Sequence, residues 1–233
     1  MKCWFNNFQV PFKAKISEKE VDSFQHAEQY FSDCYLMSTL DTLSHSENGR
    51  KILKNQIEYD DENPKLVNCY LYNKNGEKIK YTVPTDIALK GYEKLYEHQP
   101  NQLIRSVNVS VNEYEKKYKE KPLVSKLADT FNDYVFEKNQ PSHFMKMFTG
   151  IEPTVNIAET SLNIDLSKHK EQVMEVFKRM EQEKEHSLVI GTGPKMLDGR
   201  TWHVYVLEDV DLENGTITVK NKRGNQKRTM NTQ

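Results

Sequence analysis

Residues 29–46 read QYFSDCYLMSTLDTLSHS, and this stretch joins a cysteine to the start of an apolar helical pattern. Leu36, Leu40 and Leu43 recur at spacings of three and four, which is typical of the buried face of a helix. The pattern begins at Cys34. The stretch therefore predicts a helix that starts at or next to this cysteine.

The two residues before the cysteine, Ser32 and Asp33, are favoured at the N-cap of a helix. Cys34 would then lie in the first turn, where unpaired backbone N–H groups and the helix dipole favour negative charge. A thiolate at this place is stabilised and nucleophilic. The helix start is equally compatible with a buried structural cysteine, so the rest of the chain has to decide between the two.

The composition excludes several classes of protein. The chain has 233 residues, enough for one large domain or two packed lobes with a sizeable core. Its 33 Lys and Arg residues nearly balance 34 Asp and Glu residues, and a net charge of −1 does not favour nucleic-acid or membrane-surface binding. Ten Phe, twelve Tyr and two Trp residues argue against disorder.

The sequence indicates a reducing, cytoplasmic setting. No apolar run approaches the roughly 20 residues of a membrane helix, and residues 1–15 (MKCWFNNFQVPFKAK) lack a secretory-signal pattern. Cys3, Cys34 and Cys69 form neither a metal-ligand pair nor an even disulfide framework, so neither a metal nor a cofactor is expected. Export by a route that needs no such signal stays open.

Hydrophobic periodicity places helices mostly before residue 185 and strands mostly after it, an α+β arrangement. The sequence NKNG (residues 73–76) is a turn signal that predicts a β-hairpin. We expect an N-terminal arm (1–24), a mainly helical lobe with the cysteine (25–155) and a β-rich lobe (156–233). The individual predictions are a capped helix at 17–24, closure of the cysteine helix near Gly49, a helical turn at 50–57, hairpin strands at 66–73 and 77–84, a strand at 103–111, a solvated charge run at 114–121, helices at 123–136, 141–148 and 167–185, and strands at 187–191, 202–208 and 216–221.

A nucleophilic cysteine needs a base within hydrogen-bond reach and a third group that orients this base. Among the seven histidines, His203 stands out because it begins an alternating apolar strand pattern, WHVYVLE. Asn221 ends the returning strand, and the turn DLENG brings the two strand ends together. An amide oxygen there can hold the imidazole in the tautomer that serves a thiol. A packed strand histidine is the plainer interpretation of His203 alone.

Six segments, in the same order, resemble the calpain family of cysteine peptidases. SDCYLMSTLDTLS (32–44) is similar to the family's GDCW(L/F)LAAL-type signature. TWHVYVLEDV, which follows SLVIGTGP, is similar to the strand pair with GHAYSVL, and GTITVKNKRG is similar to the strand that ends in NPWG. The other similar segments are LYNKNGEKIKYTVPTDI (71–87), PLVSKLADTFNDYVF (122–136) and FMKMFTGIEP (144–153).

The resemblance implies a papain-like two-lobe fold, with a helical lobe packed on an antiparallel β-sheet lobe, and a protein or peptide substrate. It implies that Cys34 is the nucleophile, that His203 is the general base and acid, and that Asn221 orients the imidazole. It also implies that Gln29, together with the backbone N–H of Cys34, forms the oxyanion hole. No nucleic-acid or membrane partner follows from it, and calcium ligands of the family cannot be matched residue by residue.

Four positions depart from the family pattern. The family's oxyanion-hole glutamine stands six residues before the cysteine, where this chain has Glu28, so Gln29 takes the role only across a one-residue deletion. Ser32 and Trp202 replace the glycines before Asp-Cys and before the histidine, and Trp202 is expected to narrow the cleft. Arg223 replaces the tryptophan of NPWG.

The leading hypothesis is therefore a calpain-like thiol endopeptidase with a Cys-His-Asn triad. One alternative is a calpain-like module that has lost catalysis and acts by binding, which the departures from the family pattern favour. Another is a different acyl-transfer enzyme, such as a transglutaminase or an amidase, because the same triad serves several chemistries. The sequence does not specify the substrate, the cleavage preference, the activation mechanism or the oligomeric state.

Overall fold

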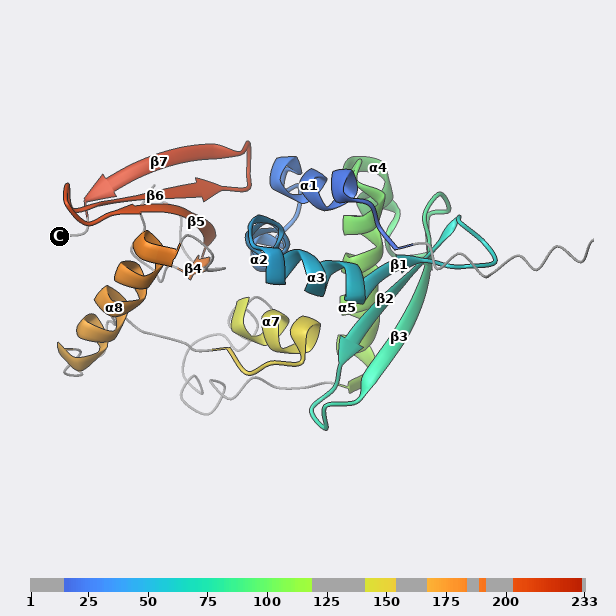
Figure 1. Ribbon diagram of the computed structural model, residues 1–233. Coiled ribbons are helices and arrows are strands. Elements are labelled where there is room, and N and C mark those ends of the chain that lie inside the picture. Colours follow the sequence, from blue (N-terminus) through green and yellow to red (C-terminus); the bar gives the residue numbers. More distant parts are fainter. Residues whose placement is uncertain (1–14, 119–140, 154–166, 184–188, 192–202, 232–233) are drawn as a thin grey trace, which may run out of the picture.

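The computed structural model describes residues 15–118, 141–153, 167–183, 189–191 and 203–231. These residues form an α+β structure with two antiparallel sheets, as predicted (Figure 1). The helices are α1 (Glu18–His26), α2 (Cys34–His45), α3 (Glu47–Gln56), α4 (Glu93–His98), α5 (Gln102–Tyr118), α7 (Pro141–Thr149) and α8 (Ser167–Glu183). The strands are β1 (Ile57–Tyr59), β2 (Leu66–Tyr72), β3 (Lys78–Pro84), β4 (Val189–Gly191), β5 (Val204–Asp211), β6 (Thr216–Asn221) and β7 (Gln226–Asn231).

Helix α2 lies at the centre of this arrangement. The four-stranded sheet β4-β5-β6-β7 lies on one side of it, and α5 with the three-stranded sheet β1-β2-β3 lies on the other (Figure 1). Every residue from Cys34 to Ser44 is buried, and only His45 is exposed. A helix buried all round belongs in the middle of a core. The predicted apolar face, Leu36, Leu40 and Leu43, is confirmed as buried, but it is only part of the buried surface.

The beginning and end of the cysteine helix differ in how well they were predicted. The helix begins at Cys34 as expected, but α2 ends at His45, and the predicted closing residue Gly49 lies within α3. Ser46 caps α3 by accepting a hydrogen bond from the Gly49 N–H at 3.0 Å. A Cβ at Gly49 would come within 2.1 Å of the Leu43 carbonyl oxygen, so close packing of the two helices requires glycine here.

The three-stranded sheet contains the predicted hairpin. Strands β2 and β3 pair antiparallel across the turn at residues 73–76, where Gly76 has a φ of 77°. Strand β1, which was not predicted, pairs with β2, and Ile57 lies opposite Cys69. Residue Lys15 also pairs with Glu58 of β1, so the start of the described chain lies along this sheet edge.

The predicted strand at 103–111 is wrong, because these residues belong to helix α5. Asn101 caps this helix through its Oδ1 atom, which accepts from the N–H groups of Leu103 and Ile104 at 3.0 and 3.1 Å. Residues 106–111 are all buried, so their partial alternation does not mark one face of a strand. The charge run that follows is also not a simple solvated face, because Tyr114 is fully buried.

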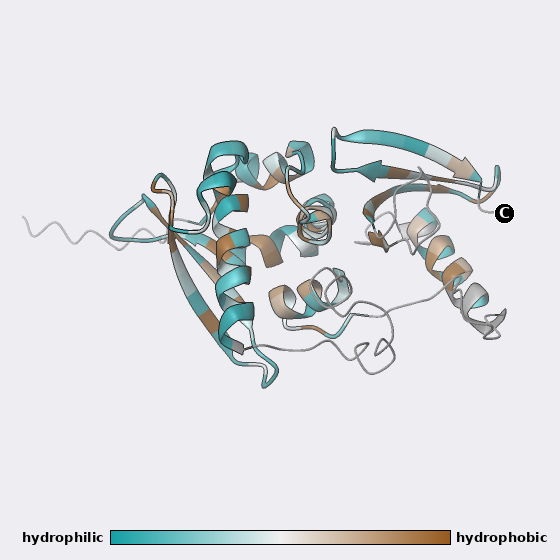
Figure 2. Ribbon diagram, turned by 180° about the vertical axis from the view of Figure 1, so that it is seen from behind, coloured by the Kyte–Doolittle hydropathy of each residue, from teal (hydrophilic) through white to brown (hydrophobic). Residues whose placement is uncertain are grey.

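The four-stranded sheet confirms the predicted strands at its centre and adds one. β5 pairs with β6 and β4, while β7, which was not predicted, pairs with β6. Met180 of α8 packs on this sheet with Tyr205 and Val219. The apolar residues gather where α8 faces the sheet, whereas β7 is mostly hydrophilic and exposed (Figure 2).

Several further predictions can be compared with the structure. The predicted capped helix at 17–24 is confirmed as α1, where Ser17 and Glu20 form a capping box, and Gly150, with a φ of 73°, directly follows α7. The predicted helix at 123–136, most of the N-terminal arm and Trp202 lie outside the described residues.

No helix in the described part of the chain is long and apolar enough to cross a bilayer. Helix α4 was not predicted.

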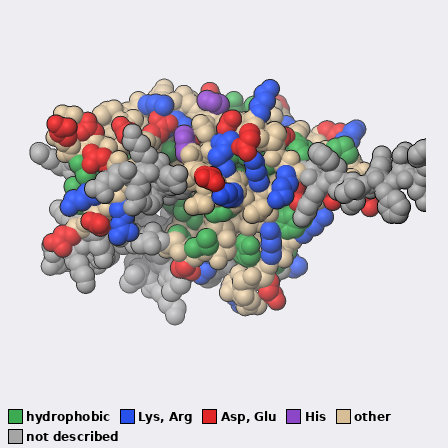
Figure 3. Space-filling view, in the orientation of Figure 1, with side chains coloured by type: hydrophobic (Ala, Val, Ile, Leu, Met, Phe, Trp, Pro, Cys, Tyr) green, Lys and Arg blue, Asp and Glu red, His purple; other side chains and the backbone are tan. Residues whose placement is uncertain are grey.

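The surface carries charges of both signs. Over the middle of the face in Figure 3, Lys and Arg side chains lie beside Asp and Glu side chains. Arg50 pairs with Glu18 and Asp22 of α1, which ties α3 to α1 at the surface. Exposed pairs of this kind contribute little to stability, about 0–1 kcal/mol each.

Candidate active site

Cys34 occupies the predicted place at the first position of α2. The residue is 6% exposed. Asp33 is the N-cap residue by position, but its side chain makes no capping hydrogen bond and instead accepts from Asn108 Nδ2 at 3.0 Å. The expected side-chain cap is therefore absent, because the buried Asp33 carboxylate is turned toward helix α5.

Burial dominates the electrostatics of this cysteine. It raises the pKa of the Cys34 thiol, and the neighbouring Asp33 carboxylate adds to the rise, whereas a hydrogen bond from the backbone of Val204 opposes it. The expectation of a thiolate stabilised by the helix start is thus outweighed. Cys34 is a neutral thiol at neutral pH, and it needs a base if it is to act as a nucleophile.

His203 and Asn221 form the predicted pair. The ring Nε2 of His203 lies 2.9 Å from Asn221 Oδ1, and the two residues are 8% and 5% exposed. The strand register explains the contact. Val206 of β5 pairs with Lys220 of β6, so His203 and Asn221 lie diagonally across the ends of the two strands.

The tautomer of His203 follows from a second hydrogen bond. The backbone N–H of Arg223 donates to the same Asn221 Oδ1 atom at 2.9 Å. An N–H can only donate, so this atom must be the amide oxygen, and the Nε2 of His203 must carry the proton that it shares with it. In the neutral ring, Nδ1 then carries the lone pair. This is the nitrogen that a general base would use toward a thiol.

The start of α2 contacts the backbone of β5 next to His203. Val204, the residue after His203, is buried in the same core as α2. Its carbonyl oxygen accepts from Ser38 Oγ at 3.2 Å, and its backbone also hydrogen-bonds the Cys34 thiol. The first two turns of α2 therefore contact the backbone one residue beyond His203. A direct approach of Nδ1 to the Cys34 sulfur stays a prediction.

Gln29 lies in the segment that leads into α2, as the proposed oxyanion role requires. Its backbone N–H donates to the Lys222 carbonyl oxygen at 2.9 Å. Its side-chain Nε2 donates to the Phe31 carbonyl oxygen, while its Oε1 atom is buried without a partner. One of the two amide protons is thus engaged within the segment, and the oxyanion role of Gln29 stays a prediction.

Sequence reasoning missed an ionic cluster beside these residues, formed by Asp41, Lys220 and Lys222. Asp41 Oδ2 lies 2.7 Å from the Nζ atom of each lysine, and Asp41 Oδ1 lies 2.8 Å from His45 Nε2. The side chains of Asp41 and Lys222 are fully buried. The sequence contains two signals from which the cluster could have been predicted. One is a lone aspartate in an apolar helix, and the other is a pair of lysines on both sides of Asn221.

The pKa of Asp41 shows that the cluster compensates for burial. Burial by itself raises the pKa of this carboxyl, but the hydrogen bond to His45 and the charges of Lys222 and Lys220 hold it below its ordinary value. Burial lowers the pKa of the Lys222 ammonium, and Asp41 opposes that effect. Asp41 is therefore an ionised carboxylate held by two buried lysines.

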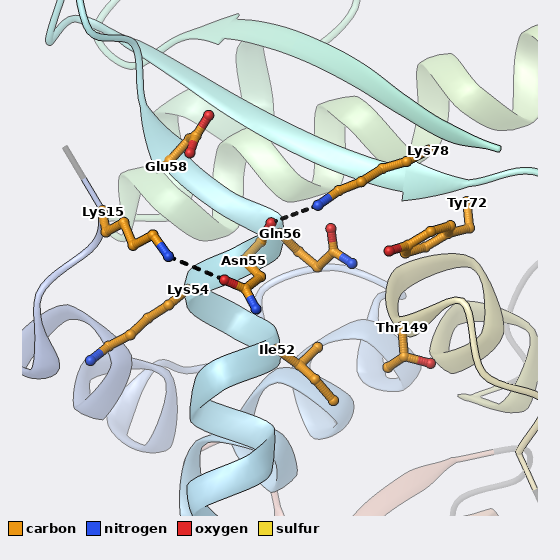
Figure 4. Close-up of a pocket in the computed structure, with 9 residues that line it drawn as sticks. All are labelled: Lys15, Ile52, Lys54, Asn55, Gln56, Glu58, Tyr72, Lys78 and Thr149. Carbon is orange, nitrogen blue, oxygen red and sulfur yellow. Dashed lines mark hydrogen bonds between the residues drawn. The ribbon is translucent and has the colours of Figure 1, made fainter. Parts of the chain in front are cut away.

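A cavity of about 350 Å³ lies elsewhere, at the end of α3 (Figure 4). It contains no cysteine or histidine. Lys15 and Lys78 point toward Asn55 and donate to its side-chain and backbone oxygens at 3.2 and 2.9 Å. Lys78, which bonds a backbone carbonyl of the last turn of α3, helps to cap the C-terminus of this helix, a structural role. This cavity is separate from the candidate site.

Cys69 provides a contrast with Cys34. It is fully buried in β2, and burial raises the pKa of its thiol to about 12, a rise that Ser110 opposes through a hydrogen bond. Cys69 is therefore a packed strand residue. Among the described residues, no group of His, Cys, Asp and Glu side chains is arranged to hold a metal ion.

Comparison with known proteins gives no further guidance: models of protein families, curated proteins and solved structures all yield no match to this chain.

Proposed function

We propose that this chain is a cysteine endopeptidase of the papain-like, calpain-related type, with Cys34 as nucleophile, His203 as general base and acid, and Asn221 as the orienting residue. The observation that carries the proposal is the hydrogen bond between His203 and Asn221. It leaves the lone pair of a neutral ring on Nδ1, and the next residue, Val204, contacts the start of the cysteine helix through its backbone. The calpain-like order of sequence segments supports it.

The proposed reaction begins with proton transfer. His203 Nδ1 takes the proton of the Cys34 thiol as the sulfur attacks the carbonyl carbon of a peptide bond. The tetrahedral intermediate collapses, the C–N bond breaks, and the imidazolium returns the proton to the leaving amine. Water then hydrolyses the thioester with His203 acting again as base. Asn221 stabilises the imidazolium by accepting its Nε2–H.

The oxyanion that forms during attack needs donors. The first turn of α2 presents unpaired backbone N–H groups, of which that of Cys34 is the proposed donor. The second proposed donor is the side-chain amide of Gln29, whose remaining N–H would have to turn toward the substrate. Removal of one such donor typically costs about 10²–10³ in rate. A Gln29→Ala variant is therefore expected to lose activity without loss of Cys34 labelling.

Labelling of the cysteine tests the proposal directly. The native protein is incubated at neutral pH with an epoxysuccinyl inhibitor of thiol proteases, and the intact mass is measured. We expect one adduct, located at Cys34 by peptide mapping. Cys34→Ala should abolish it and Cys69→Ala should retain it. Absence of an adduct on native Cys34 would contradict the proposal.

Two other functions have specific observations in their favour. The neutral, buried Cys34 and the engaged amide of Gln29 favour a binding module without catalysis. In that case neither labelling nor peptide cleavage occurs. An acyl transferase with the same triad would label at Cys34. It would give amine-capped products rather than new peptide termini when a peptide mixture is incubated with added amine.

A further inference from the structure

Lys222, in the ionic cluster beside the candidate triad, has all of its hydrogen-bonding capacity used. An ammonium group has three protons to donate. Lys222 Nζ donates to Asp41 Oδ2 at 2.7 Å and to the carbonyl oxygens of Phe24 and Gln25 at 3.1 and 3.0 Å. Both carbonyls belong to the last turn of α1, where helical carbonyls lack partners of their own. Lys222 therefore joins α1 to α2.

Lys220 repeats this arrangement two residues earlier in the chain. Its Nζ atom lies 2.7 Å from Asp41 Oδ2 and 3.1 Å from Glu208 Oε1, and it donates to the Gln25 carbonyl oxygen at 3.3 Å. The side chain is 6% exposed. Two ammonium groups from β6 and the residue after it thus converge on one carboxylate of α2.

Asn221 lies between these two lysines in the chain. Alternate residues of a strand point to opposite faces, so the lysines hold one face on α1 and α2 while Asn221 presents its amide on the other. The backbone of Lys222 also accepts from the Gln29 N–H at 2.9 Å. Asn225 adds a bond from its Nδ2 to the His26 carbonyl at 2.8 Å. The segment with Asn221 is therefore fixed to the segment that leads into the cysteine helix.

We propose that Asp41 is a positioning residue for the His203–Asn221 pair: through Lys220 and Lys222 it holds the end of β6 on the helix that begins with Cys34. The effect of Asp41 on catalysis rests on the proposed function, whereas its effect on the position of the end of β6 does not. Without the carboxylate, the two ammonium groups lose their shared partner and the end of β6 is released from α2. The Nε2–H bond of His203 then opens to solvent more often.

The rate at which the His203 Nε2–H exchanges with water tests the inference. In protein labelled with ¹⁵N-histidine, the buried His203 Nε2–H should give an NMR signal in slow exchange with water, assigned by its loss in His203→Ala. We expect Asp41→Asn and Lys222→Met to accelerate its solvent exchange about tenfold or more, because local opening becomes easier. The matched control, Glu47→Gln, removes a carboxylate from the exposed pair with Lys51 and should leave the exchange rate unchanged.

A second variant keeps the test decisive if these substitutions unfold the protein. Replacement of the whole cluster by apolar residues (Asp41→Leu, Lys220→Met and Lys222→Met together) removes all three charges, and such replacements are often neutral or stabilising. A folded triple variant with accelerated exchange at His203 supports the inference. Unchanged exchange in any folded variant that lacks Asp41 overturns it and leaves the cluster a purely structural role.

The outcomes separate this inference from the proposed function. If Cys34 is not labelled in the wild-type protein but the His203 exchange responds to Asp41, the positioning role stands and the peptidase proposal fails. If Cys34 is labelled in a His203-dependent manner and Asp41→Asn changes neither the labelling rate nor the exchange, the peptidase proposal stands and the positioning role fails.

Discussion

The two sides of helix α2 are held by different forces. Toward the N-terminal half, Leu36 and Leu40 are fully buried in a core that includes Phe24 and Phe144. Toward the C-terminal sheet, Val204 joins the same core, and polar groups are added to the contact: the Ser38–Val204 hydrogen bond and the Asp41 cluster. Apolar packing is non-directional and does not respond to pH, whereas buried charges need one geometry and one protonation state. His203 and Asn221 lie on the side that depends on these polar contacts.

The largest expected effect on stability is that of Asp41→Asn, on the side of α2 that faces the C-terminal sheet. Asp41→Asn removes one partner of a buried pair and leaves the buried Lys222 ammonium without a counter-charge, while Lys220 keeps Glu208. We expect a loss of about 3–5 kcal/mol in the free energy of unfolding. Urea denaturation of the variant and of Glu47→Gln measures it. A loss below that of an exposed pair, about 1 kcal/mol, would show that the cluster does not join the two halves.

A core substitution on the side of α2 that faces the N-terminal half should cost a comparable or smaller amount of unfolding free energy. Leu40 is fully buried, and Leu40→Ala deletes side-chain volume from the core. Substitutions of this kind cost about 2–5 kcal/mol. Because Leu40 takes no part in the His203–Asn221 hydrogen bond, a folded Leu40→Ala protein should keep the slow exchange of the His203 Nε2–H. Accelerated exchange in Leu40→Ala would contradict the division between the two sides.

The two losses should differ in their pH dependence. The pKa of Asp41 is lowered in the folded state, so its stabilisation is fully present above the unfolded pKa of about 3.9 and disappears as pH falls through the lower, folded value. The stability difference between wild type and Asp41→Asn should therefore stay constant from neutral pH to about 5 and shrink below about 4. The difference for Leu40→Ala should stay constant throughout. Urea unfolding at three pH values distinguishes these results.

The smallest effect concerns Asp33. Burial raises the pKa of its carboxyl, and its charge in turn raises the pKa of the Cys34 thiol. Asp33→Asn keeps an oxygen for Asn108 and removes the charge. The rate of Cys34 alkylation at mildly alkaline pH should rise by less than about tenfold, which corresponds to a pKa change of under one unit. An unchanged or lower rate would show that Asp33 does not influence the thiol.

The sequence was most informative where one local pattern determines the structure. The start of α2 at Cys34, the hairpin of β2 and β3 and the approach of Asn221 to His203 follow from periodicity and turn chemistry. Strand 103–111 was predicted wrongly because a helix buried on most sides hides its 3.6-residue period. The Asn101 cap was the signal that should have been weighed.

The ionic cluster could not be predicted from the sequence with the same rules. Asp41 and Lys222 are far apart in the chain, and their contact depends on how the sheet docks on α2. Sequence patterns give the faces of single elements, but they do not give the docking of one element on another. The same limit applies to the electrostatics of Cys34, because the burial that raises its pKa comes from the packing of α2 among its neighbours.

The most direct test of the Cys34–His203 pair is the pH profile of Cys34 alkylation by iodoacetamide in wild type and His203→Ala. If His203 acts as the base, the wild-type rate should rise with the deprotonation of the imidazole and exceed that of His203→Ala at neutral pH by about 10²-fold or more. His203→Ala should follow only the elevated pKa of the buried thiol. Superimposable profiles for the two proteins would contradict the proposed triad.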